Sequence, residues 1–317
     1  MLIDILLLLV GFVALIFGAS KLVDAASSLA AKMGVPSIVI GLTIVAFGTS
    51  APELVVNVFA ALKGSKEMVM GNVLGSNIFN VLGILGISAI IFPLTVKTNT
   101  TWIEVPLSFL AAILVFVVGA DVLLDGAGAN IISRSEGIVL LLFFLIFLAY
   151  NLIVAKGGAA DEEIETKEYS NFAAIAFIIL GLAGLIIGGR LIVTSAVSLA
   201  EMIGLSERVI GLTVVSIGTS LPELATSIIA VRKKNVDIAI GNVVGSNIFN
   251  IFLILGVSGT IVPLTLQENT FFDILVNILA GLLLFIFIFT GKGRQLERWE
   301  GFVFIALYIA YLSYLII

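Results

Sequence analysis

The sequence contains no cysteine and no histidine, and it carries little charge. Of its 317 residues, 12% are charged, about half of the ~25% that is usual in soluble domains. Without cysteine it can form neither a disulfide framework nor a thiolate metal site. Without histidine it lacks the usual zinc ligand and the usual proton carrier near neutral pH. With 60% hydrophobic residues, the composition instead predicts a polytopic membrane protein that lies almost wholly within the bilayer.

Apolar stretches of about 20 residues, the length that spans the hydrocarbon layer, recur ten times. Each is expected to be a helix, because a helix satisfies its own backbone groups in lipid. The first stretch follows no basic segment, so we interpret it as a transmembrane helix rather than a removable signal peptide. The predicted spans are 2–31, 37–62, 68–92, 102–124, 134–155, 171–200, 207–231, 237–262, 271–291 and 299–317.

The two halves of the chain are repeats of each other. A shift of 170 residues superposes 39–43 on 209–213, 75–80 on 245–250, and 93–95 on 263–265. Each repeat has five spans, an odd number, so the second repeat enters the membrane from the opposite side. Such inverted repeats are typical of secondary transporters, whose sites lie near the midplane between the repeats. We therefore expect a first repeat at 1–155, an acidic linker at 156–170 and a second repeat at 171–317.

Basic residues are unevenly distributed between the two sets of loops. The rule that cytoplasmic loops are positive places the richer set, with the acidic linker, in the cytoplasm, and both termini outside. The expected location is the cell membrane. The richer set holds Lys32, Lys97, Lys156, Lys167, Arg232, Lys233, Lys234, Lys292, Arg294 and Arg298, whereas the opposite loops hold Lys63, Lys66, Arg134 and Arg208.

One polar motif, Gly-Thr-Ser-x-Pro-Glu, interrupts an apolar span in each half, at 48–53 and 218–223. A charged side chain at the bilayer centre costs ~2.5–3.5 kcal/mol on insertion scales. Proline also removes a backbone donor and frees the carbonyl four residues earlier, which belongs to Gly48 or Gly218. In a membrane such a carbonyl must face protein, a cavity or an ion. The duplicated motif predicts an ion site.

Helical spacing brings further oxygen-bearing side chains to the same place. Thr49 and Glu53 are four residues apart and share a helix face, and Ser76 and Asn80 do so in the next span. Because every candidate ligand is an oxygen, the set favours Ca²⁺ or Na⁺ over Zn²⁺ or Cu⁺. The second half contributes the equivalent residues Thr219, Ser220, Glu223, Ser246 and Asn250.

Other roles remain open for the uncharged members of this set. The hydroxyls could bond to helix carbonyls around the proline, and the serines and amides could bond between helices. The equally repeated Asn72, Asn77, Asn242 and Asn247 are interpreted first as packing or helix-bonding residues.

The segments 41–53 and 71–78, with their second copies, resemble the α-repeats of the sodium/calcium exchanger family. The resemblance covers nearly the whole chain and leaves no room for a large regulatory domain. It implies an all-α protein of ten transmembrane helices, with helices 2, 3, 7 and 8 broken. It also implies alternating access and a central Ca²⁺ site that shares ligands with flanking Na⁺ sites.

Carried over by position, the resemblance gives each site residue a role. Glu53 and Glu223 match the central acidic ligands, and Asn80 matches the first-repeat amide. Hydroxyl ligands are matched by Thr49, Ser50, Thr219 and Ser220 on the broken helices, and by Ser76 and Ser246 on their neighbours. Ala46 and Ser216 match positions that offer backbone carbonyls.

Asn250 departs from the family pattern, because many members carry aspartate there. With Glu53 and Glu223 ionised the site has a charge of −2, which one Ca²⁺ or two Na⁺ neutralise. A third Na⁺ would leave +1. We hypothesise that Asn250 weakens or reshapes one cation site and alters coupling.

The sequence thus predicts an antiporter that exchanges Ca²⁺ for Na⁺, with Ca²⁺ efflux driven by Na⁺ entry. A Ca²⁺/H⁺ or K⁺-dependent exchanger is the alternative, and a cation channel is a more distant one. No nucleophile, general-base set or phosphate-binding motif occurs, so we expect neither an enzyme nor a nucleic-acid binder. We expect no prosthetic group, only transported Ca²⁺ and Na⁺, and a protein that functions as a monomer in the lipid bilayer.

Overall fold

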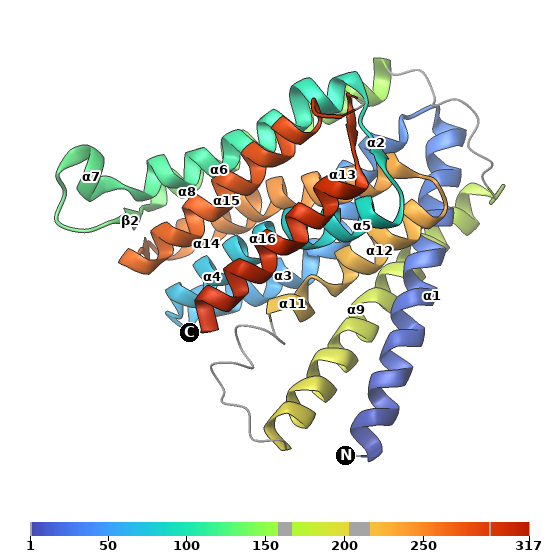
Figure 1. Cartoon of the computed structure of the whole chain (residues 1–317), viewed down its shortest axis with the longest axis horizontal. Helices are drawn as coiled ribbons and strands as arrows, with labels where there is room; N and C mark the ends of the chain where they lie inside the picture. Colours follow the sequence, from blue (N-terminus) through green and yellow to red (C-terminus); the bar gives the residue numbers. More distant parts are fainter. Residues whose placement is uncertain (1, 158–166, 203–215, 292, 317) are drawn as a thin grey trace.

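A computed structural model describes residues 2–157, 167–202, 216–291 and 293–316, and these residues are almost entirely helical (Figure 1). Most of the predicted linker and the beginning of the predicted seventh span lie outside the described residues. The first half contains α1 (Leu2–Met33), α2 (Ser37–Ile40), η1 (Gly41–Val45), α3 (Ala46–Leu62), α4 (Lys66–Ile78), η2 (Phe79–Leu85), α5 (Gly86–Ile91), β1 (Leu94–Thr95), η3 (Thr100–Glu104), α6 (Val105–Gly119), α7 (Asp121–Asp125), β2 (Ile131–Ile132) and α8 (Arg134–Gly157).

The second half follows a similar order. Its elements are α9 (Asn171–Met202), α11 (Ser216–Thr219), α12 (Leu221–Arg232), α13 (Val236–Ile248), η5 (Phe249–Leu255), α14 (Gly256–Ile261), β3 (Leu264–Thr265), α15 (Glu268–Phe287), β4 (Gln295–Leu296) and α16 (Arg298–Ile316).

Eight helices of the described residues are long and apolar enough to cross a membrane. These candidate membrane spans are Ile3–Met33, Ser37–Leu62, Lys66–Ile91, Thr100–Gly119, Arg134–Lys156, Asn171–Leu199, Val236–Ile261 and Asn269–Phe287. The fourth is shorter than predicted. It ends at Gly119, and α7 is a separate short helix that closes at Gly126 in the left-handed conformation. The Asp121 carboxylate accepts a hydrogen bond from the Ile131 backbone, which stabilises this polar turn.

The predicted breaks in the helices take two forms. In three spans the helix widens instead of breaking: η1, η2 and η5 are π-helical segments inside continuous helices. Segments of this kind are frequent at functional sites. In the second half the helix does break at Ser220, between α11 and α12 and two residues before Pro222. In the first half α3 continues through Pro52.

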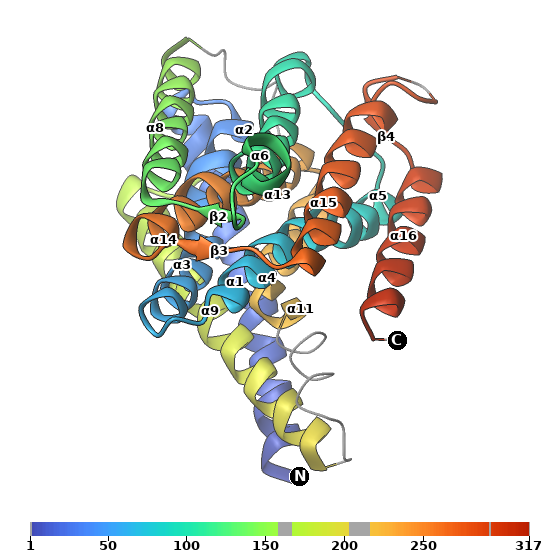
Figure 2. The same ribbon diagram turned by 90° about the vertical axis from the view of Figure 1, so that its left-hand side faces the viewer.

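The first helices of the two halves, α1 and α9, run side by side and extend beyond the other helices (Figures 1 and 2). Glycines allow this close approach, because a Cβ on Gly18 would lie 2.7 Å from the Gly181 carbonyl oxygen. On the outer face of α1, Ile3 and Val13 are about 70% exposed, which suits contact with lipid tails.

We expect Gly188→Ala to destabilise the α1–α9 pair. Its Cβ would lie 2.7 Å from both the Gly11 carbonyl oxygen and the Leu15 nitrogen, which are backbone atoms that cannot rotate away. Overpacking of this kind costs about 1–3 kcal/mol. Gly189→Ala is the matched control, because its Cβ would meet Pro222 at an ordinary 3.7 Å. Thermal unfolding in detergent measures the difference, and equal midpoints for the two variants would contradict the packing argument.

Each copy of the repeated Pro-Leu-Thr segment pairs with the other half of the chain. Strand β1 runs antiparallel to β4, with Leu94 opposite Leu296, and β3 runs antiparallel to β2, with Leu264 opposite Ile132. Two short sheets therefore connect loops of one half to loops of the other.

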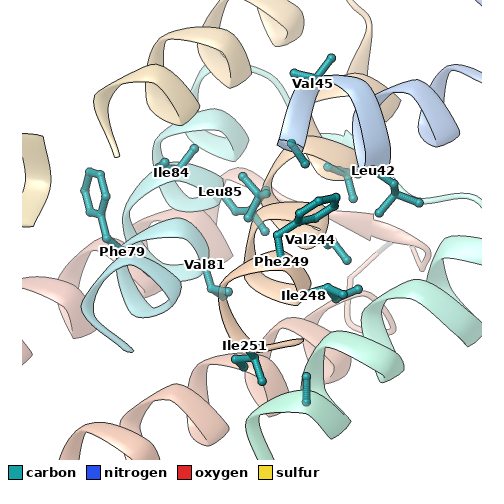
Figure 3. Close-up of a cluster of buried hydrophobic side chains, with 14 of the residues drawn as sticks. Leu42, Val45, Phe79, Val81, Ile84, Leu85, Val244, Ile248, Phe249 and Ile251 are labelled. Atoms are coloured by element: carbon teal, nitrogen blue, oxygen red, sulfur yellow. The ribbon is translucent and has the colours of Figure 1, made fainter. Parts of the chain in front are cut away.

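Part of the hydrophobic core is formed by residues of the π-helical segments. Leu42 and Val45 of η1, Phe79 and Leu85 of η2, and Phe249 of η5 are buried together (Figure 3). Phe249 also packs edge-on against Phe144 of α8, with ring centroids 5.0 Å apart. This apolar cluster holds in place the helices that carry the duplicated polar motifs of both repeats.

Candidate ion-binding site

Two carboxylates from different halves are buried together at the centre of the molecule. Glu53 on α3 is 2% exposed and Glu223 on α12 is 1% exposed, and the two groups interact electrostatically. The Oε2 atom of each has no hydrogen-bond partner in the described structure. Two acidic groups buried near each other without a positive partner are unfavourable. The arrangement therefore favours a cation between them.

Four serine hydroxyls form two pairs across the halves, and one of these pairs contacts the Glu223 carboxylate. Ser50 Oγ lies 3.0 Å from Glu223 Oε1 and 2.9 Å from Ser246 Oγ. Ser246 Oγ lies 3.5 Å from the same carboxylate oxygen. The repeat-related pair, Ser220 and Ser76, has its hydroxyls 3.2 Å apart. Each pair joins one half of the chain to the other.

The two threonines make more local bonds. Thr49 Oγ1 donates towards the backbone oxygens of Val45 (3.1 Å) and Ala46 (3.3 Å) and lies 3.1 Å from Asn242 Oδ1. Thr219 Oγ1 lies 3.4 Å from Asn72 Oδ1. The Thr49 hydroxyl therefore bonds to carbonyls of its own helix in this structure, which is the alternative to binding an ion. One of these carbonyls is that of Ala46, itself a candidate ligand. The side chain of Ser216, where α11 begins, lies outside the described residues.

The two candidate amide ligands are held by other asparagines. Asn80 on η2 and Asn250 on η5 are buried, and their nitrogens donate to Asn247 Oδ1 (3.0 Å) and Asn77 Oδ1 (2.9 Å). The Oδ1 atoms of Asn80 and Asn250 have no partner in the described structure. Sequence reasoning assigned Asn77 and Asn247 to packing or helix bonding, and did not foresee that they contact the candidate ligands.

The contacts of Asn72 and Asn242 were also not anticipated. Asn242 Nδ2 donates to the Glu223 backbone oxygen (3.2 Å) and to Ser227 Oγ (3.0 Å), while its Oδ1 faces Thr49. The signal that could have found these four asparagines is their exact duplication at a shift of 170 residues.

The resulting chemistry is that of an all-oxygen site with two formal charges. Four buried oxygens, one each on Glu53, Glu223, Asn80 and Asn250, are without partners among the described residues. The described part of the chain contains no group of three or more acidic side chains that could hold a metal ion by charge alone. Two carboxylates with neutral amide and hydroxyl oxygens suit hard cations such as Ca²⁺ and Na⁺.

Comparison with known proteins agrees with this chemistry. The model of the family described as "Sodium/calcium exchanger protein" matches residues 3–153 and 173–317. Sodium/calcium exchanger MaX1 of Methanosarcina acetivorans is 36% identical, over 98% of this chain and 97% of its own. Inner membrane protein YrbG of Escherichia coli is 39% identical, over 89% of each chain.

A solved structure shares the fold. The sodium–calcium exchanger NCX_Mj, soaked with 10 mM Na⁺ and no Ca²⁺, superposes with a TM-score of 0.84 and 32% identity over 98% of each chain. Family model, relatives and fold thus agree along nearly the full length. The chain belongs to the sodium/calcium exchanger family.

Proposed function

We propose that this protein is a secondary active antiporter that exchanges Ca²⁺ for Na⁺, with Ca²⁺ leaving the cell as Na⁺ enters. The observation that carries the proposal is a set of buried side-chain oxygens from both halves, one each on Glu53, Glu223, Asn80 and Asn250, that have no hydrogen-bond partner among the described residues. The ligands would be the carboxylates of Glu53 and Glu223, the side-chain oxygens of Asn80, Asn250, Ser50, Ser76, Ser220, Ser246, Thr49 and Thr219, and the backbone carbonyls of Ala46 and Ser216. Two relatives that are named as sodium/calcium exchangers, MaX1 and NCX_Mj, support the same pair of ions.

Charge balance explains how one site could couple two ions. Two ionised carboxylates give −2, which one Ca²⁺ or two Na⁺ neutralise. An empty site would have to occlude two unpaired carboxylates in a low-dielectric interior, which is strongly unfavourable. Loaded states would therefore cross the membrane and the empty state would not, so that exchange follows without a chemical step.

The proposed architecture is that of the sequence prediction. Ten membrane spans form two inverted repeats around the site, with both termini outside and the 156–170 linker in the cytoplasm of a multi-pass cell-membrane protein. The described α16 and the α11–α12 pair are helical where the tenth and seventh spans are expected. The protein would work as a monomer, without a prosthetic group and without enzymatic activity.

The test is ⁴⁵Ca²⁺ uptake into proteoliposomes that are loaded with Na⁺, and with K⁺ or a pH gradient as controls. We expect uptake only when an outward Na⁺ gradient is present. Uptake driven by the proton gradient alone would favour Ca²⁺/H⁺ exchange instead. Uptake that requires K⁺ together with Na⁺ would indicate the K⁺-dependent type, and flux independent of every counter-ion would indicate a channel.

Asn250→Asp should change the Na⁺ dependence of exchange. A third carboxylate would give the site −3 and allow a further Na⁺ to be neutralised, so we expect a steeper dependence of ⁴⁵Ca²⁺ flux on Na⁺ concentration. Asn277→Asp is the control, because Asn277 is a buried asparagine of α15 outside the proposed site. Identical Na⁺ dependence in Asn250→Asp and the parent would remove the idea that residue 250 sets coupling.

A further inference from the structure

Asn77, Asn80, Asn247 and Asn250 form a closed hydrogen-bonded group, which we call the asparagine quartet. Asn77 and Asn80 come from the α4–η2 helix of the first half, and Asn247 and Asn250 from the α13–η5 helix of the second. All four are at least 96% buried. The hydrogen bonds of the quartet run between the two halves in matching pairs, so the quartet has the same twofold relation as the repeats.

Backbone carbonyls fix the orientation of the first two amides. Asn77 Nδ2 donates to the Asn247 backbone oxygen (3.3 Å), and Asn247 Nδ2 points at the Asn77 backbone oxygen (3.5 Å). A carbonyl oxygen can only accept, so the nitrogen of each side chain must lie on that side. The Oδ1 atoms of Asn77 and Asn247 are thereby directed the other way.

These two oxygens fix the orientation of the second pair of amides. Asn247 Oδ1 can only accept, and it accepts from Asn80 Nδ2 at 3.0 Å. Asn77 Oδ1 accepts from Asn250 Nδ2 at 2.9 Å. The side-chain nitrogens of Asn80 and Asn250 are thus hydrogen-bonded, whereas their Oδ1 atoms have no partner among the described residues.

Amide orientation matters because the two ends of the side chain have opposite polarity. The oxygen attracts a cation, whereas a flipped amide would present N–H groups and repel it. We propose that Asn77 and Asn247 are positioning residues that hold the oxygens of Asn250 and Asn80 towards the transported cation, each acting from the opposite half. The inference rests on the proposed function and adds two residues that bind no ion themselves.

The first test compares Ca²⁺ affinity in the purified full-length protein. The readouts are Ca²⁺-dependent thermal stabilisation in detergent and half-saturation of ⁴⁵Ca²⁺ exchange. Asn247→Leu should raise the half-saturating Ca²⁺ concentration at least tenfold, because Asn80 is free to rotate. Asn151→Leu is the matched control: Asn151 is also a buried asparagine, but it donates only to Phe147 of its own helix. Equal affinity in Asn247→Leu and the parent would overturn the proposal.

A double-mutant cycle separates positioning from packing. A carboxylate presents an oxygen whichever way it turns, so Asn80→Asp no longer needs Asn247 to orient it. In the parent, by contrast, the new carboxylate would face Asn247 Oδ1, acceptor against acceptor. The gain in Ca²⁺ affinity from Asn80→Asp should therefore be at least tenfold larger in the Asn247→Leu background than in the parent. Equal gains in both backgrounds would show that Asn247 has only a structural role.

The twofold relation supplies a second, independent cycle from Asn77→Leu and Asn250→Asp, which keeps the proposal testable if Asn247→Leu does not fold. Failure of the proposed function would look different. In that case the parent and Asn151→Leu would either not bind Ca²⁺ or bind it without Na⁺-driven ⁴⁵Ca²⁺ exchange. If both bind Ca²⁺ and the two cycles show no coupling, only the positioning role is wrong.

Discussion

Glu53→Gln should abolish Ca²⁺ exchange while leaving the protein folded, and Glu223→Gln should do the same. Each change halves the formal charge of the proposed site from −2 to −1. A single remaining carboxylate no longer neutralises Ca²⁺, and the bound ion would carry +1 into a buried, low-dielectric place. We expect Na⁺-driven ⁴⁵Ca²⁺ uptake to fall at least a hundredfold.

Thermal stability supplies a second readout, because the variants should be more stable than the parent in chelator and should lack the stabilisation that Ca²⁺ gives the parent. In chelator each variant should be more stable than the parent, because the repulsion between two buried acidic groups is gone. With Ca²⁺ the parent should gain stability and the variants should not, since ligand stabilisation follows binding. Parent-like stabilisation by Ca²⁺ in either variant would place the ion elsewhere.

Glu104→Gln is the matched control for these variants. Glu104 is 1% exposed and lies at the beginning of a membrane-spanning helix, where its Oε1 accepts a hydrogen bond from Tyr150 at 2.5 Å. Glutamine can accept the same bond through its carbonyl oxygen. Exchange should therefore persist. A loss of exchange in all three variants would point to a general need for buried acids rather than to one central site.

The polar motif was the part of the site that sequence could best predict. An acidic side chain is so unfavourable in lipid that its occurrence in the same motif of both halves predicts one ion site to which both halves contribute. The structure brings Ser50 within hydrogen-bonding distance of Glu223 and Ser246, although they are far apart in sequence. Composition and spacing carry this information because it depends on residue type.

Features that depend on tertiary packing could not be predicted in this way. The spacing of apolar residues does not indicate the π-helical segments η1, η2 and η5. A π-helical turn contains an extra residue, and the packing of neighbouring helices determines where such a turn forms. The roles of Asn77 and Asn247 escaped for a related reason. Spacing shows that two asparagines share a motif, but only their partners show which end of each amide points where.

Gly245→Ala should disable exchange by moving a helix that carries the site. Gly245 of α13 precedes Ser246 and lies against the second span. A Cβ at this position would come 2.8 Å from the Ala46 Cβ and 2.9 Å from the Leu42 carbonyl oxygen. Relief requires α13 to shift, which costs about 1–3 kcal/mol and draws Ser246 away from Ser50. We expect a lower unfolding midpoint and at least a tenfold loss of ⁴⁵Ca²⁺ exchange.

A compensating change distinguishes this collision from general damage. Ala46→Gly removes the methyl group that the new Cβ would strike, while the Ala46 backbone carbonyl stays in place. In the Gly245→Ala background it should restore part of the exchange, and only part, because the Leu42 oxygen remains too close.

Gly301→Ala is the control for helix packing elsewhere: its Cβ would lie 2.7 Å from the Gly86 carbonyl oxygen, between α16 and α5. That variant should lose stability and keep its half-saturating Ca²⁺ concentration, and Ala46→Gly should not rescue it. Rescue of both variants, or of neither, would mean that the contact between α13 and the second span does not set the geometry of the ion site.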